Sequence, residues 1–236
     1  MELRNINVII TGATGMVGEG VLHECLNDSR IASITLINRR SAGVAHPKVK
    51  EVLIADLFAF TGNEPGITKA DVCFYCLGTT SIGKSEDDYT RLTYDLTFII
   101  AKALLKLNRD MSFCYVSAKG TDNSEKGKTM WARIKGRTEN DLARMEFRQL
   151  YVFRPFMLTP TKGLQNAHGF YKYISWLFPL GRRIYPEGFC TLKELALAMI
   201  QAGYQGYDKR IITPTDMVRL ARYGRVKTSQ SSLLPS

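Results

Sequence analysis

Long apolar runs, a regular cysteine framework and clustered histidines are all lacking from this sequence. No run reaches the roughly 18 apolar residues that a membrane-spanning helix requires, and the polar start Met1–Asn7 is not typical of a secretory signal peptide. Five scattered cysteines do not predict a disulfide framework. The three histidines are isolated from one another, so we expect no metal site. These absences predict a cytoplasmic protein in a reducing compartment.

Charge of either sign is not concentrated in any block. Lys and Arg number 32 against 22 Asp and Glu, a net charge of +10, but the basic residues are dispersed. The sequence has neither zinc-finger spacing nor the aromatic signature of RNA-binding modules. The positive balance therefore points to anionic ligands or an anionic membrane surface, and it does not favour nucleic acid as a partner.

Apolar residues are present in the amount that one substantial core requires. The 236 residues are 45% hydrophobic, which fits a single domain better than two. We expect this domain to span residues 1–223, with its core at 5–160 and a cap with C-terminal elements at 161–223. The polar, Ser-rich segment 224–236 is expected to be a flexible tail.

The segment Val8–Gly18 reads VIITGATGMVG, a short apolar run followed at once by three spaced glycines. A buried strand that turns sharply into a helix has this pattern, and the free N–H groups at the helix N-terminus can bind a phosphate. The spacing is G-x-x-G-x-x-G instead of G-x-G-x-x-G, but its place after a strand favours a dinucleotide over a purely structural turn. The expected contacts are Gly12, Thr14, Gly15, Met16, Val17 and Gly18.

Strands and helices are expected to alternate along the chain after this turn. Such alternation predicts a doubly wound parallel sheet, the Rossmann architecture, with a small C-terminal cap. The expected strands are Ser33–Asn38, Val49–Ala55, Asp71–Leu77, Ser112–Val116 and Leu150–Phe153, and the expected helices are Met16–Leu26, Tyr89–Leu107 and Thr129–Met145. In the C-terminal part, we expect a helix at Thr191–Gln201 with a capping box of Thr191 and Glu194, a short strand at Arg210–Thr213 and a helix from Pro214.

The second expected strand ends at Asn38-Arg39-Arg40, where a cofactor with a free ribose 2′-hydroxyl would require an acidic residue. Guanidinium groups bind phosphate instead, so this strand end favours NADP(H) over NAD(H); the alternative is a solvated basic turn. Asp56 ends the third strand, where it can accept a hydrogen bond from the adenine amino group or cap a turn.

Ligands of doubly wound sheets bind at the carboxyl ends of the strands, so the remaining strand ends are also candidates. The fourth strand runs into a glycine and two threonines, the fifth ends at Ser117, and the sixth ends in FRP. The expected cofactor contacts at these ends are Leu77, Gly78, Thr79, Thr80, Ser117 and Pro155.

The motifs GATGMVG, NRR, CLGTT, VSAKG, KG and FRP occur in the order seen in atypical short-chain dehydrogenase/reductases. Over about residues 5–160 the chain resembles most the branch of Tat-interacting-protein-like oxidoreductases. The resemblance implies that Lys135 binds the nicotinamide ribose and that Ser117 polarises a substrate carbonyl. The wider superfamily uses a Tyr four residues before this Lys as general acid or base, and Trp131 occupies that position here.

Three interpretations of Trp131 stay open. The first is that the alignment is shifted, although no Tyr lies between residues 116 and 150. The second is that another group supplies the proton, such as Tyr89, Tyr94, Tyr171 or a water. The third is that NADP(H) binds without efficient turnover. An indole N–H only donates, and it has no pKa near neutrality. We expect an NADP(H)-binding reductase of a small carbonyl compound, and the alternative is a non-catalytic NADPH-sensing module with a regulatory protein partner.

The segment Phe170–Leu180 reads FYKYISWLFPL and is followed by two arginines. Aromatic side chains beside cations suit a membrane interface or a partner groove, so the segment allows peripheral membrane contact. The alternative is that it covers the substrate pocket or packs on the sheet.

Overall fold

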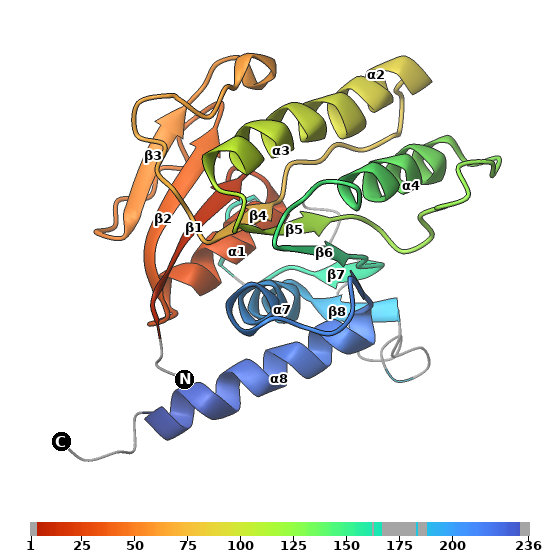
Figure 1. Ribbon diagram of the computed structural model, residues 1–236. Helices are drawn as coiled ribbons and strands as arrows, with labels where there is room; N and C mark the ends of the chain where they lie inside the picture. The colour runs from red at the N-terminus through yellow and green to blue at the C-terminus, as the bar shows by residue number, and fades with distance from the viewer. Residues whose placement is uncertain (1–3, 162, 167–182, 184–187, 232–236) are drawn as a thin grey trace.

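The computed structural model describes residues 4–161, 163–166, 183 and 188–231. Within these residues, a seven-stranded parallel sheet has the order β3-β2-β1-β4-β5-β6-β9 (Figure 1). This arrangement confirms the predicted doubly wound α/β fold. The strands are β1 (Ile6–Thr11), β2 (Ile31–Asn38), β3 (Val49–Leu53), β4 (Val72–Tyr75), β5 (Ser112–Val116), β6 (Gln149–Phe153) and β9 (Ile211–Ile212).

The strand order reverses at β1, which pairs with β2 on one side and with β4 on the other. The connections that follow β1 and β4 therefore leave the sheet in opposite directions, and they open a crevice at the carboxyl ends of these strands. The glycine-rich turn after β1 and the loop after β4 border this crevice. The topology thus brings together two of the segments that we predicted to bind a cofactor.

Helices cover both faces of the sheet. One face carries α1 (Met16–Leu26) and α7 (Leu192–Gln205), and α8 (Pro214–Ser231) packs against α7 (Figure 1). The other face carries the 3₁₀-helix η1 (Leu57–Ala59), α3 (Leu96–Leu107) and α4 (Met130–Leu142). Because neighbouring strand residues point to opposite faces, Ile9 belongs to the core under α3, while Val8 and Ile10 belong to the core under α1 and α7.

The helices α1 and α7 come from distant parts of the chain and lie in close contact. A Cβ atom at Gly20 would lie only 2.5 Å from the side chain of Leu192. Leu192, Leu195 and Met199 of α7 are fully buried against the same face of the sheet as α1. The C-terminal helices are therefore part of the core that supports β1.

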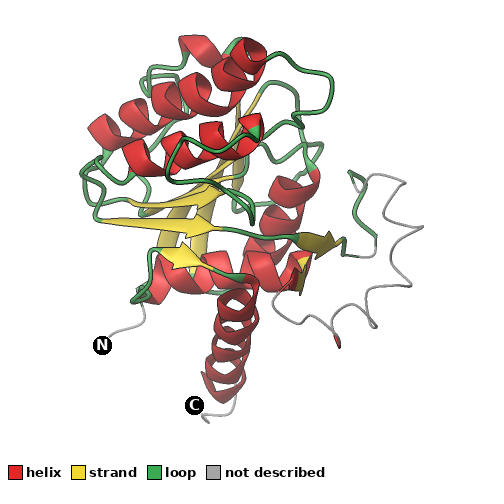
Figure 2. Ribbon diagram, turned by 90° about the vertical axis from the view of Figure 1, so that its right-hand side faces the viewer, coloured by secondary structure: helices red, strands yellow, loops and turns green. Residues whose placement is uncertain are grey.

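A second, two-stranded parallel sheet, which the sequence did not predict, joins the end of the expected core segment 5–160 to the expected cap segment 161–223. It is formed by β7 (Met157–Thr159) and β8 (Phe189–Thr191), which lie beside the main sheet (Figure 2). The chain that leaves β7 is attached to α1, because the Glu19 carboxylate accepts hydrogen bonds from the backbone N–H groups of Gln165 and Asn166 at 2.7 and 2.8 Å.

Several expected boundaries differ from the observed ones. The predicted helix Tyr89–Leu107 is divided into α2 (Glu86–Thr90), a π-helical turn η2 (Arg91–Asp95) and α3. The capping box of Thr191 and Glu194 is confirmed at the start of α7. Helix α8 continues to Ser231, so residues 224–231, where we expected a tail, have helical backbone.

The aromatic segment Phe170–Leu180 lies outside the described residues, and so does Tyr171. Among the helices that the structure describes, none combines the length and the apolar character needed to cross a bilayer. Membrane contact through the aromatic segment stays a prediction.

Candidate functional site

The glycine-rich turn has a geometry that larger residues cannot adopt. Gly12 has φ +72°, and a Cβ there would lie 3.1 Å from the backbone of Cys76 and Leu77. A Cβ on Gly18 would collide with the backbone carbonyl of Gly12. Both glycines therefore permit close backbone contacts, one to the loop after β4 and one within the turn itself.

The N-terminus of α1 is open to a ligand. Gly15 is the N-cap residue and is exposed, and no side chain of the described part of the chain forms a capping hydrogen bond there. The N–H groups at the start of a helix have no intrahelical acceptor, and the helix dipole makes this end positive. The backbone of Met16, Val17 and Gly18 can therefore bind a pyrophosphate, as the sequence predicts, and Thr14 lies partly buried just before this turn.

At the end of β2, three predicted contacts have different environments. Asn38 is buried, its Oδ1 accepts from the N–H of Ala13 at 3.0 Å, and its Nδ2 donates to Glu51 at 3.0 Å. Asn38 thus holds the glycine-rich turn from inside. Arg39 and Arg40 are exposed, and neither forms a hydrogen bond or an ion pair with the residues that the structure describes. Two guanidinium groups are available at this strand end.

The loops after β3 and β4 hold the next group of predicted contacts. Asp56 caps η1, because its Oδ1 accepts from the N–H of Phe58 at 2.9 Å, which is the capping role we had left open. The loop after β4 is tied to β1 through the N–H of Cys76, which donates to Thr11 Oγ1 at 3.2 Å. Gly78 is exposed, with open space where a Cβ would be, so a ligand can approach its backbone closely.

Ser117, at the end of β5, belongs to a buried polar network. Its Oγ donates to Glu139 Oε1 at 2.5 Å and lies 3.1 Å from Thr121 Oγ1. The same carboxylate accepts from Arg154 Nε at 3.0 Å, and Arg154 Nη2 forms an ion pair with its other oxygen. The Glu139 side chain is only 3% exposed. While Ser117 donates to Glu139, its proton is not available to a substrate.

Sequence reasoning missed Glu139 and Arg154. One signal was present, because Glu139 follows Lys135 by four residues and therefore lies on the same face of α4. Arg154 lies at the sixth strand end, directly before Pro155, whose carbonyl accepts from the N–H of Lys119 at 2.8 Å.

Trp131 and Lys135 lie on the side of α4 that packs on the loop after β5. A Cβ on Gly136 would collide with the backbone carbonyl of Asp122, so the helix and the loop are in direct contact. Gly120 has φ +89°, and a Cβ there would lie 3.3 Å from the Trp131 ring. The indole therefore covers this loop at the carboxyl edge of the sheet.

Lys135 has an ammonium group without a hydrogen-bonding partner among the described residues. Its Nζ lies 5.6 Å from the centroid of the Tyr115 ring. Burial lowers the pKa of Lys135 from 10.5 to about 8, and the nearby Glu139 carboxylate opposes this effect. An unpaired cation at this position is consistent with a ligand that would complete its hydrogen bonds.

We expect that Lys135→Met raises the free energy of unfolding at pH 7 by about 3 kcal/mol, because it removes a cation whose pKa folding lowers. Between about pH 8 and 10.5, the folded protein has lost this proton and the unfolded chain retains it, so the wild type recovers stability relative to the variant as pH rises. Urea unfolding of both proteins at pH 7 and pH 10 measures the difference. A difference that does not shrink with pH would contradict the lowered pKa.

The two described tyrosines that we considered as proton donors do not fit that role. Tyr94 donates to Asp141 Oδ2 at 2.7 Å, and the guanidinium carbon of Arg137 lies 4.3 Å from the centroid of the Tyr94 ring. Tyr89 is 2% exposed. Burial is the main cause that raises the pKa of both phenols above the ordinary value, so neither is an acid matched to neutral pH.

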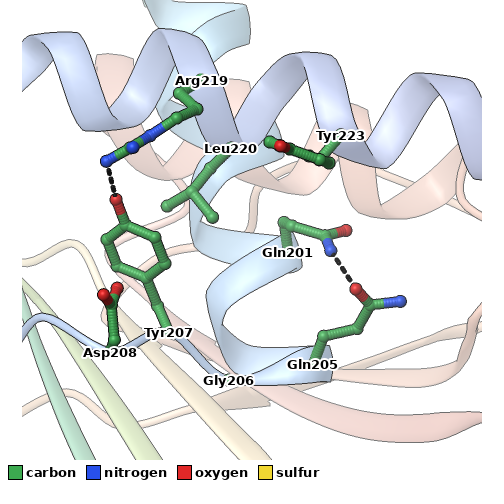
Figure 3. Close-up of a pocket in the computed structure, with 8 residues that line it drawn as sticks. All are labelled: Gln201, Gln205, Gly206, Tyr207, Asp208, Arg219, Leu220 and Tyr223. Atoms are coloured by element: carbon green, nitrogen blue, oxygen red, sulfur yellow. Dashed lines mark hydrogen bonds between the residues drawn. The ribbon is translucent and has the colours of Figure 1, made fainter.

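A cavity of about 460 Å³ lies between the end of α7 and α8 (Figure 3). Within it, Gln201 donates to Gln205 at 2.6 Å, and Arg219 donates to the Tyr207 hydroxyl at 2.5 Å. None of the predicted cofactor contacts lines this cavity. It is therefore distinct from the site at the strand ends.

Comparison with family models gives no match. Protein HTATIP2 of Rattus norvegicus is 30% identical over 159 residues, which are 66% of this chain and 64% of that protein. Protein FMP52 of Chaetomium globosum, named as mitochondrial, is 25% identical over 226 residues, which are 91% of this chain and 96% of that protein.

Several solved structures have a similar fold. The UDP-N-acetylglucosamine 4-epimerase from Methanobrevibacter ruminantium has a TM-score of 0.63 and 19% identity, and the comparison covers 96% of this chain and 82% of that one. The Bordetella bronchiseptica enzyme WbmF, solved in complex with NAD⁺, has a TM-score of 0.60 and 13% identity, with 97% and 80% covered.

The sheet order and the glycine-rich turn define a Rossmann fold, which these solved structures share. In sequence, the chain is similar to the HTATIP2 and FMP52 proteins, and it spans 64% of the length of the HTATIP2 protein. The FMP52 relatives are named as mitochondrial proteins, so a cytoplasmic location stays a prediction for this chain.

Proposed function

We propose that the chain is an NADP(H)-dependent oxidoreductase that reduces a small carbonyl compound. The observation that carries the choice of cofactor is the pair of exposed arginines directly after β2, beside the glycine-rich turn. Arginine binds a phosphate through two parallel hydrogen bonds, and no acidic side chain occupies the positions next to Asn38. This strand end therefore suits a 2′-phosphate better than a 2′-hydroxyl.

We assign successive parts of the dinucleotide to residues at successive strand ends along the crevice. The uncapped first turn of α1 accepts the pyrophosphate, and the open space at Gly78 lets the backbone approach the cofactor. When bound, the cofactor supplies the hydride. The protein then has to orient the substrate, exclude water and provide a proton for the carbonyl oxygen.

Our assignment gives Lys135 and Ser117 different tasks. Lys135 is protonated at neutral pH and has unused hydrogen-bond donors, so it binds ribose hydroxyls. Ser117 supports the loop after β5 through Glu139 instead of donating to the carbonyl. Trp131 covers the same loop, and its indole N–H donates hydrogen bonds but does not transfer its proton at neutral pH, so we expect a slow reductase.

Titration of the purified protein with NADPH and NADH tests this proposal. Intrinsic tryptophan fluorescence, checked by calorimetry, reports binding because Trp131 lies at the carboxyl edge of the sheet. Tight NADPH binding with weak NADH binding supports the proposal. Binding of neither cofactor would refute it, and it would equally refute a module that senses NADPH.

The second candidate function is an NADPH-sensing module that changes partners without turnover, and Trp131 is the observation that favours it. A Trp131→Tyr substitution distinguishes the two candidates. If a carbonyl substrate already binds, the phenol supplies the missing acid, and we expect kcat to rise by about 100-fold, the lower end of the usual contribution of a general acid. The assay is NADPH oxidation across a panel of aldehydes and ketones.

Trp131→Phe is the matched control, since it keeps an aromatic ring over Gly120 but adds no hydroxyl. An equal rate for the wild type and both variants across the panel would argue for the non-catalytic module.

A further inference from the structure

Glu51 lies on β3, beside the strand end that carries the arginine pair. Leu36 of β2 pairs with Glu51 in the sheet register, so Asn38, two residues further along β2, projects from the same face as Glu51. This placement brings a partly buried carboxylate to the loop that follows the arginines. Neither the predicted cofactor contacts nor the proposed mechanism includes this carboxylate.

Three donors from this region converge on the Glu51 carboxylate. Oε2 accepts from the Ser41 hydroxyl at 2.6 Å, and Oε1 accepts from the N–H of Ala42 at 2.7 Å and from Asn38 Nδ2 at 3.0 Å. Burial works against the charge, but the hydrogen bonds from Ser41, Ala42 and Asn38 outweigh it and hold the pKa of Glu51 below its ordinary value. The group is therefore ionised at neutral pH.

The same hydrogen bonds continue to the glycine-rich turn. Asn38 donates to Glu51 through its Nδ2 and accepts from the N–H of Ala13 through its Oδ1. A single chain of contacts thus connects the turn that would bind the pyrophosphate with the loop at Ser41 and Ala42. Arg39 and Arg40 lie in the sequence between Asn38 and Ser41, and both of these residues are held by hydrogen bonds to Glu51.

We propose that Glu51 is a positioning residue that sets the preference for a dinucleotide with a 2′-phosphate, by fixing the backbone on either side of Arg39 and Arg40. The inference rests on the proposed NADP(H) function. A flexible loop would have to be ordered when the phosphate binds, and this ordering would cost affinity for NADPH but not for NADH. The hydrogen bonds to Glu51 remove that cost before the ligand arrives.

The charge of Glu51 acts in the opposite direction. A carboxylate near a bound phosphate repels it, and this term alone would weaken NADPH binding. Both oxygens of the carboxylate accept hydrogen bonds that hold the loop, and the same carboxylate bears the charge that repels the phosphate. The positioning effect and the repulsion therefore come from one group. Substitutions that change geometry and charge separately distinguish them.

The experiment compares Glu51→Ala, Glu51→Gln and a control, Glu64→Ala, in titrations with NADPH and NADH. Glu64 is matched because it also accepts three hydrogen bonds, from the N–H and hydroxyl of Thr61 and the N–H of Gly62, and because these bonds outweigh burial and lower the pKa of its carboxyl. It lies on the loop after η1, and these hydrogen bonds join it to residues of that same loop.

For Glu51→Ala, we expect the Kd for NADPH to rise by about tenfold and the Kd for NADH by less than about threefold. Glu51→Gln keeps an oxygen for Asn38 and Ala42 and removes the charge, so it retains the NADPH preference. Glu64→Ala leaves both affinities unchanged. As a second readout, amide hydrogen exchange at Ala42 is faster in Glu51→Ala than in the wild type without any cofactor.

If Glu51→Ala does not fold, Ser41→Ala removes one of the three donors and is expected to lower the NADPH preference in the same direction. Equal weakening of both cofactors in Glu51→Ala, or an NADPH preference that survives in Glu51→Ala, overturns the inference. A wild type without NADPH preference overturns the proposed function as well, so the two failures are distinguishable.

Discussion

Arg154→Met is expected to lower the free energy of unfolding by about 3–5 kcal/mol, because it leaves a buried carboxylate without its cation. Arg154 pairs with Glu139, whose side chain is 3% exposed and which also accepts the proton of Ser117. A carboxylate at this depth has little access to water, and the remaining neutral donors, the Ser117 hydroxyl and the Asn123 amide, cannot replace a guanidinium. Urea unfolding at pH 7 measures the loss.

Two controls separate burial from the removal of a charge. Arg144→Met breaks an ion pair with Asp141, but the Arg144 side chain is 78% exposed, and we expect a loss below about 1 kcal/mol. The double variant Arg154→Met with Glu139→Gln removes both charges and should recover a large part of the stability. A single-variant loss as small as that of Arg144→Met would show that water reaches Glu139.

The second large effect is expected for Arg39→Ala combined with Arg40→Ala, which should raise the Kd for NADPH by about 100-fold. Each guanidinium forms charge-assisted hydrogen bonds to the 2′-phosphate, and each bond of this kind contributes about 1.5–3 kcal/mol. NADH lacks this phosphate, so its Kd should change by less than about threefold. The two titrations are performed at the same ionic strength, because the contribution is sensitive to salt.

The matched control replaces two exposed arginines elsewhere, Arg109→Ala with Arg144→Ala. Both side chains are more than three-quarters exposed, and their ion pairs with Glu146 and Asp141 lie on the surface. This variant loses the same net charge, so any general electrostatic effect on an anionic ligand appears in it too. An equal loss of NADPH and NADH affinity in Arg39→Ala/Arg40→Ala would rule out the phosphate assignment.

Local patterns account for the parts of the fold and site that the sequence predicted. The glycine-rich turn depends on a strand, three glycines and a helix within eleven consecutive residues, and the structure gives Gly12 a positive φ as the turn requires. The capping box of Thr191 and Glu194 likewise spans four residues. Interactions within such short segments depend little on the rest of the chain.

The missed parts depend on contacts between distant segments. Ser117, Glu139 and Arg154 come from β5, α4 and the end of β6, and no local pattern indicates that a serine at a strand end would donate to a buried carboxylate. Asn38 was predicted to face the cofactor, but Glu51 on the neighbouring strand and Ala13 occupy its amide group. The strands β7 and β8 have three residues each, which are too few to show the alternation of apolar and polar residues that marks a strand in the sequence.

The contact between Gly20 and Leu192 limits how the cofactor site could be isolated. All the predicted cofactor contacts lie within residues 5–160, yet a fragment with these bounds would lack α7 and with it the buried residues Leu195 and Met199. One side of the sheet would then expose the apolar residues beneath α7, including Ile10 of β1, to water. The residues that bind the ligand thus form a continuous stretch of chain, but the smallest unit that folds includes the helices beyond it.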